Sequence, residues 1–175
     1  MDLSRTIFEV IDTRTFSNLW FWIALAVMWS AASHRIVGVP WDMVLRARRR
    51  GGEEQADLEA LTALTVRRIL QIQTLAGIWI WGIAAFLLTL CATLGFGYGM
   101  QFPQAIFLLG FPMAIVRLIG LATARAIAAG EGAGEALYLR LRAQRLWTQA
   151  IGMISIFVTS LWGMFQNLSA SVLGG

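Results

Sequence analysis

The chain has 175 residues, enough for one domain, but its composition differs from that of a soluble protein. Hydrophobic residues make up 58% and charged residues 14%, whereas soluble domains are about 45–50% apolar and about 25% charged. This composition excludes an intrinsically disordered chain, and the single cysteine, Cys91, excludes a disulfide scaffold. With a mean hydropathy of +0.66 and a formal charge of +4, carried by arginine without any lysine, the chain is predicted to be an integral membrane protein.

The amino-terminal segment is predicted to form a short amphipathic helix. Apolar residues such as Leu3, Ile7 and Phe8 fall on one side of a helical wheel, opposite Glu9 and Asp12. Such a helix lies on a membrane surface. The segment is too long and too acidic for the first part of a secretory signal peptide, so we expect it to be retained.

Four apolar stretches follow, at residues 18–39, 74–94, 104–124 and 147–165. Each has about the 20 residues that a helix needs to cross a hydrocarbon core of about 30 Å. Barrel strands are shorter and alternate apolar with polar residues, so the stretches are predicted to be helices. The expected fold is an all-α integral membrane protein, residues 1–175, with four transmembrane helices arranged as two hairpins that carry helical extensions.

The distribution of arginines predicts how the chain is oriented. Seven lie between residues 35 and 68 and four between residues 125 and 145, against Arg5 and Arg14 on the opposite side. By the positive-inside rule, the connections 40–73 and 125–146 are cytoplasmic and both termini are periplasmic, in a bacterial inner membrane. Candidate contacts for anionic lipid headgroups or for a protein partner are Arg46, Arg48, Arg49, Arg50, Arg67, Arg68, Arg140, Arg142 and Arg145.

The two cytoplasmic connections are predicted to be helices that continue into the membrane. After Gly51 and Gly52, four acidic residues come first and Arg67 and Arg68 come last, which complements a helix dipole. No helix-breaking residue separates this segment from the second span, so residues 53–94 are expected to form one helix about 60 Å long. The glycine-rich strings at 95–99 and 130–134 lack the context of phosphate-binding loops and are predicted to be turns.

Arg117 is the only charged residue within the apolar stretch 104–124. One interpretation is a contact with an anion, a lipid headgroup or a substrate inside the bundle. The other is that its long side chain reaches the cytoplasmic interface, since Arg117 lies only eight residues before Arg125. We favour the second interpretation, because the position is nearer to the cytoplasmic end of the span than to its middle.

Further polar residues lie at the inner ends of the spans. His34 is the only histidine, and one imidazole does not make a metal site. Glutamines and threonines at the inner ends of the second and fourth spans could line a polar vestibule, although hydrogen bonds between helices are their more common role. These residues are Gln71, Gln73, Thr74, Thr148 and Gln149. No catalytic, metal-binding or cofactor-binding set is found, and no nucleic-acid-binding module either.

The tryptophans are predicted to serve the membrane rather than chemistry. Trp20 and Trp162 lie towards the outer interface, and Trp41 and Trp147 towards the inner one. Trp29, Trp79 and Trp81 lie deeper, where they are expected to fill the space between helices.

One stretch carries a family resemblance. Residues 8–44, FEVIDTRTFSNLWFWIALAVMWSAASHRIVGVPWDMV, resemble small alphaproteobacterial inner-membrane proteins identified as components of the SufBCD complex, and the layout is similar over the whole chain. The resemblance implies an accessory role in iron–sulfur cluster assembly. A cluster held by four thiolates needs more cysteines than Cys91, so the chain is not expected to hold the cluster itself.

Three functions remain in order of preference. The first is a non-enzymatic inner-membrane scaffold whose arginine-rich cytoplasmic face docks a protein complex, with Suf machinery as the implied partner. The second is a small transporter or channel component that uses Arg117 for an anionic solute. The third, a membrane enzyme, is least favoured because no catalytic constellation is found.

Overall fold

The computed structural model describes the backbone of residues 15–173 and the side chains of residues 15–169. The predicted amphipathic helix at residues 3–12 lies outside the described residues. The rest is almost wholly helical, as predicted. The elements are η1 (Thr15–Ser17), α2 (Leu19–His34), β1 (Arg35–Ile36), β2 (Val39–Pro40), α3 (Trp41–Arg50), α4 (Gly52–Ala92), the π-helical turn η2 (Thr93–Gly97), α5 (Gln101–Ala126), the π-helical turn η3 (Ile127–Glu131) and α6 (Gly134–Leu173).

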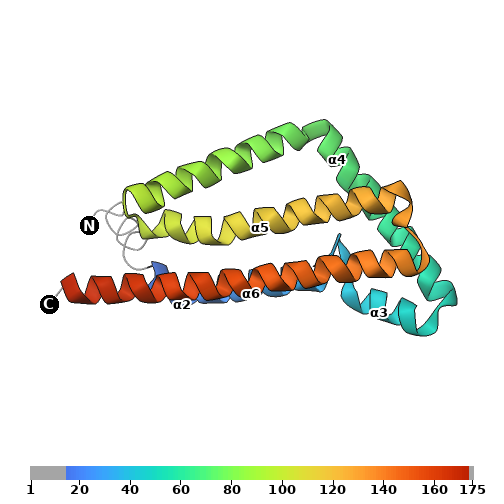
Figure 1. Ribbon diagram of the computed structural model, residues 1–175, viewed down its shortest axis with the longest axis horizontal. Helices are drawn as coiled ribbons and strands as arrows, with labels where there is room; N and C mark the ends of the chain where they lie inside the picture. Colours follow the sequence, from blue (N-terminus) through green and yellow to red (C-terminus); the bar gives the residue numbers. More distant parts are fainter. Residues whose placement is uncertain (1–14, 174–175) are drawn as a thin grey trace, which may run out of the picture.

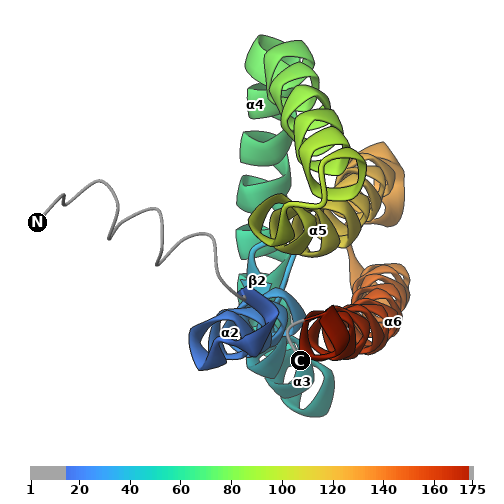
Figure 2. The same ribbon diagram turned by 90° about the vertical axis from the view of Figure 1, so that its left-hand side faces the viewer.

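The helices form a bundle with α5 in the middle. Seen along the helices in Figure 2, the second part of α4 lies on one side of α5, while α2 and α6 lie on the other. Helix α4 bends, so that its first part crosses the end of the bundle and its apolar second part returns alongside α5 (Figure 1). The ends of α3 and η3 therefore lie far from the carboxyl end of α6.

Three helical segments are long and apolar enough to cross a membrane: 52–97, 101–131 and 134–169. They include the predicted spans 74–94, 104–124 and 147–165. The predicted continuity of the second span with its charged extension is confirmed, because α4 runs without interruption for 41 residues. The fourth span likewise continues the helix that begins at Gly134. The part of the chain that the structure describes is thus consistent with an all-α membrane protein.

The first predicted span ends earlier than expected. Helix α2 has 16 residues and stops at His34, about 24 Å from its start, whereas the prediction extended to Val39. The apolar residues at 36–39 belong instead to a two-stranded antiparallel hairpin, in which Ile36 pairs with Val39. The prediction was wrong here because hydropathy does not distinguish the end of a membrane helix from a buried hairpin.

The turn of this hairpin uses unusual backbone angles. Val37 and Gly38 have φ values of 51° and 78°, as both central residues of a tight hairpin turn require. Positive φ is unfavourable for a β-branched residue such as Val37, but this side chain is buried. A Cβ on Gly38 would lie 2.8 Å from Thr65 Cγ2, so glycine allows the turn to approach α4 closely.

The largest apolar core lies at the end of the bundle where this hairpin packs. It joins the hairpin, α3, the first part of α4, the end of α5 and the start of α6, and its fully buried members include Val39, Leu58 and Leu141. We call residues 35–73 and 125–146 the headpiece. The connections are therefore not independent helical extensions, because they share one core.

The apolar part of the bundle is held by close helix contacts at glycines and by a buried glutamine. A Cβ on Gly152 of α6 would lie 2.8 Å from the Trp29 ring, so the missing side chain allows α2 to approach. Near the opposite end, buried Gln104 donates to the Gly95 carbonyl at 2.7 Å and accepts bonds from Trp162 and Gln166 at 2.9 Å. These contacts join α2, η2, α5 and α6.

The apolar half of α4 is less covered than the other segments. Only 6% of its most apolar 18-residue segment is buried against the rest of the described chain, compared with 28% for the corresponding segment of α6. Trp79, which was expected to pack between helices, is 72% exposed, whereas Trp29 is buried as expected. The surface of this half of α4 is therefore available to lipid.

Candidate functional site

Charge is concentrated at the headpiece. It carries eleven of the fourteen arginines and all seven of the acidic residues that the structure describes. The two arginine-bearing connections, predicted to share one side of the membrane, do lie together at one end of the molecule (Figure 1). The nine arginines proposed from the sequence as lipid or partner contacts all belong to this end, but their surroundings differ.

Two of these arginines form ion pairs near the turn between α3 and α4. Arg46 lies 3.3 Å from Asp42 and 3.8 Å from Glu54, and Arg50 lies 3.0 Å from Glu54. All four side chains are at least partly exposed, so these pairs contribute at most about 1 kcal/mol each. Their charges are nevertheless locally balanced.

Two further arginines make contacts within the headpiece. Arg140 of α6 binds Glu131 through two nitrogen–oxygen contacts, of which the Nη2 contact measures 2.9 Å. The guanidinium of Arg145 lies over the Trp41 ring, 4.4 Å from its centroid, and so joins α6 to α3 by a cation–π contact. Arg145 is thus engaged in packing, which the sequence pattern did not reveal.

The remaining five arginines have no carboxylate partner among the described residues: Arg48, Arg49, Arg67, Arg68 and Arg142. All five are exposed. A guanidinium presents five donors in a planar fork that matches carboxylates and phosphates. The structure thus divides one apparently uniform basic cluster into paired and unpaired groups.

Glu59 connects the two parts of the headpiece. Its carboxylate accepts the backbone N–H of Gly134, the first residue of α6, at 2.9 Å, and the side-chain amide of Gln55 at 3.0 Å. Glu59 lies in the charged half of α4, outside the apolar segment that begins at Thr74. These bonds, chiefly the one from Gly134, lower the pKa of the Glu59 carboxyl below its ordinary value. Glu59 therefore acts as a cap for α6, contributed by α4.

Arg117 does not point into the bundle. Its side chain is exposed on α5, while the preceding Val116 is buried against Leu25 and Trp29. An inward-facing anion site would need this guanidinium on the buried face. The position is compatible with a side chain that extends along the helix towards the interface.

The other polar residues proposed from the sequence do not converge. His34 and Gln71 are exposed. Gln73 accepts a bond from Trp81 of the same helix at 3.2 Å, and Thr148 donates to Gln144, also in its own helix, at 3.0 Å. Gln149 is half-buried on α6. Among the described residues, the hydrogen bonds of these side chains do not join α4 to α6, and they outline no polar vestibule.

The buried polar network around Gln104 was missed by sequence reasoning, which treated this residue only as the start of a span. Its signal was present, because Gln104, Trp162 and Gln166 are polar groups within or beside apolar stretches. The amide nitrogen of Gln104 donates to Gly95 and its oxygen accepts from Trp162 and Gln166, so its polar atoms are satisfied within the protein and the network is structural.

No group of three or more histidine, cysteine, aspartate or glutamate side chains lies close enough to hold a metal ion within the described residues. Comparison with protein-family models, with curated proteins and with solved structures finds no match.

Proposed function

We propose that this protein is a non-enzymatic membrane scaffold that docks a protein complex on its headpiece. The observation that carries the proposal is the set of five exposed arginines without carboxylate partners, set on a compact core rather than on loose loops. A rigid base reduces the entropy lost when a partner is bound. Acidic side chains on the partner would complete the ion pairs that the headpiece itself leaves unmade.

The proposal includes a location and a topology. Four crossings, with α2 as the shortest, would put the headpiece on the cytoplasmic side of a bacterial inner membrane and both termini in the periplasm. Anionic headgroups of the cytoplasmic leaflet would lie beside the same arginines. The resemblance of residues 8–44 to components of the SufBCD complex makes iron–sulfur assembly machinery the partner to test first.

Transport of an anionic solute is the weaker candidate. It depended on Arg117 facing the interior, and this side chain is exposed on the outer surface of α5. A docking role requires only the headpiece, whose unpaired arginines are accessible.

The docking proposal is tested with two double variants in α3 that remove the same charge. Arg48→Gln with Arg49→Gln removes two unpaired arginines, whereas Arg46→Gln with Arg50→Gln removes two arginines that already have partners. We expect the first variant to reduce recovery of a co-purified SufBCD complex in mild detergent by about three- to tenfold, because each exposed ion pair contributes up to about 1 kcal/mol. The second variant should reduce it much less.

Recovery is measured by quantitative mass spectrometry after equal amounts of each membrane-inserted variant have been purified. Equal losses in both variants would mean that total charge, and not the unpaired set, attracts the partner. Recovery that is unchanged in both variants, or no recovery of the complex with the wild-type protein, would contradict the proposal.

A further inference from the structure

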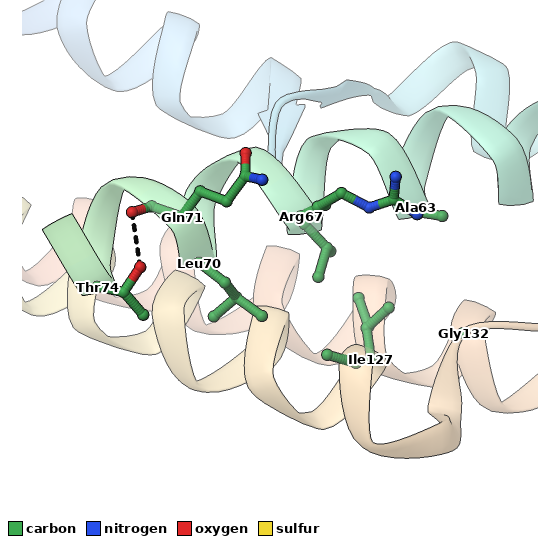
Figure 3. A pocket seen from close by; sticks show the side chains of 9 residues that line it. Ala63, Arg67, Leu70, Gln71, Thr74, Ile127 and Gly132 are labelled. Carbon is green, nitrogen blue, oxygen red and sulfur yellow. Dashed lines mark hydrogen bonds between the residues drawn. The ribbon is translucent and has the colours of Figure 1, made fainter.

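A groove opens between α4 and η3 where the headpiece meets the apolar bundle. It has a volume of about 430 Å³ and is lined by α4 from Ala63 to Thr74 and by Ile127, Ala128 and Gly132. Leu70 and Ile127 point into it from opposite sides (Figure 3). Its walls are mostly apolar, and its volume lies in the range of about 300–1,000 Å³ that is typical of small-molecule sites.

The groove has polar residues along one edge. Arg67, Gln71 and Thr74 lie on successive turns of α4, and the Thr74 hydroxyl already donates to the Gln71 carbonyl at 2.9 Å. Arg67 is the only charged residue among the described residues that line the groove. It has no ion pair in the described chain, and Glu131, which precedes the lining residue Gly132, is already bound by Arg140. The groove therefore combines an apolar wall with one uncompensated positive charge.

The groove lies where α4 changes from charged to apolar, which is the part of the helix expected at the interface of a bilayer. Arg67 and Arg68 are the last charged residues of α4, and the helix has none from there to its end. Thr74, at the other limit of the groove, begins the apolar half of α4. A molecule in the groove would thus have one end at headgroup level and the other among acyl chains.

We infer that this groove binds an anionic phospholipid, with an acyl chain along Val66, Leu70 and Ile127 and the phosphate on Arg67. The apolar walls favour a hydrocarbon chain, while the single guanidinium at headgroup level favours a phosphate. A partner helix would also fit an apolar wall, but it would leave the Arg67 charge uncompensated at the membrane interface. A soluble phosphate would bind Arg67 without contacting the apolar wall.

The inference rests on the proposed function and deepens its lipid contact. Arg67 is one of the five unpaired arginines, but the docking test changes only Arg48 and Arg49 of α3. The two therefore fail separately. Loss of partner recovery in the Arg48 and Arg49 variant would say nothing about the groove, and unchanged lipid binding in an Arg67 variant would say nothing about docking.

The test is native mass spectrometry of the purified full chain in detergent, titrated with phosphatidylglycerol or with phosphatidylcholine. Arg67→Gln should weaken binding of phosphatidylglycerol about fivefold, which corresponds to about 1 kcal/mol per arginine near an anionic lipid. Arg68→Gln is the matched control, because it removes a neighbouring charge that is also exposed but does not line the groove, and it should change the affinity less than twofold.

A second variant tests the apolar wall. Ala63→Phe should fill part of the groove and weaken binding of both lipids, because it leaves Arg67 in place and reduces the room for an acyl chain. Equal effects of Arg67→Gln and Arg68→Gln would overturn the inference, as would unchanged lipid binding in Ala63→Phe. Competition by soluble glycerol 3-phosphate at the same concentration as the lipid would also overturn it, in favour of a simple phosphate site.

Discussion

Single residues decide how closely the apolar helices approach one another. At Gly152 the backbone of α6 lies against the Trp29 ring, with room for a hydrogen atom but not for a methyl group. In a bilayer, where burial of apolar surface between helices yields little, such close backbone contact is a main source of association. Gln104 provides the polar counterpart, since its side chain is buried and its bonds reach three other residues.

Gly152→Ala should destabilise the protein by about 1–3 kcal/mol, because a Cβ 2.8 Å from Trp29 forces the ring or the helix to move. The matched control is Gly82→Ala, since Gly82 also lies within a helix and a Cβ there meets nothing within 4 Å. That change should be neutral or slightly stabilising, as alanine favours a helix. Thermal unfolding in detergent measures both. Equal melting temperatures for the two variants would show that α2 does not pack on α6 at this glycine.

At the scale of elements, the headpiece depends on contacts between segments that are distant in sequence. The Arg145–Trp41 contact joins α6 to α3, and Glu59 of α4 caps the start of α6. The buried apolar side chains of the hairpin at residues 35–40 share one core with α3, α4 and α6. The headpiece is therefore expected to unfold as one unit.

Glu59→Gln should lower the stability of the headpiece by about 0.3–1 kcal/mol at neutral pH, because it removes a negative charge from the amino end of α6. Since the pKa of Glu59 is lowered in the folded protein, its contribution is present above the unfolded carboxyl pKa of about 4.3. The contribution is lost as the pH falls through the lower, folded pKa.

The measurement compares thermal unfolding of the wild type and the variant at pH 7 and again at acidic pH, where the difference should disappear. Asp57→Asn is the control, because Asp57 is exposed beyond the first turn of α4 and forms no ion pair with any described residue. A difference between wild type and Glu59→Gln that persists unchanged in acid would contradict the role of the carboxylate charge.

At the scale of the whole molecule, we expect α2 to cross the bilayer although it is short. Its 16 residues extend about 24 Å, less than a hydrocarbon core of about 30 Å. Its start nevertheless lies beside the end of α6, where Ser17 donates to Asn167 at 2.5 Å. This contact places the start of α2 at the end of the bundle opposite to the headpiece, while His34 lies beside the headpiece, so α2 runs the length of the apolar bundle.

Cysteine labelling tests this topology in a Cys91→Ser background. We expect Ser17→Cys and Tyr98→Cys to react with a membrane-impermeant maleimide added to intact spheroplasts, because η1 and the turn after η2 lie at the end of the bundle opposite to the headpiece (Figure 1). Glu53→Cys should react only after the membrane has been opened. Protection of Ser17→Cys together with Glu53→Cys would mean that α2 does not cross. Reaction of Glu53→Cys alone would mean that the headpiece faces the periplasm, opposite to the proposed orientation.

The sequence by itself determined the membrane class, the continuity of α4 and the gathering of arginines at one end. These features follow from hydropathy and from the absence of breakers, which act locally along the chain. Only the tertiary structure decided that residues 36–39 lie outside the first apolar helix, that Arg145 packs on Trp41, and that Arg48 and Arg49 stay unpaired while Arg46 and Arg50 do not. The hairpin core and the Arg145–Trp41 contact join segments that are distant in the chain, and a local pattern does not specify what lies against a helix. The ion pairs of Arg46 and Arg50 are local, but those with Glu54 depend on the turn between α3 and α4.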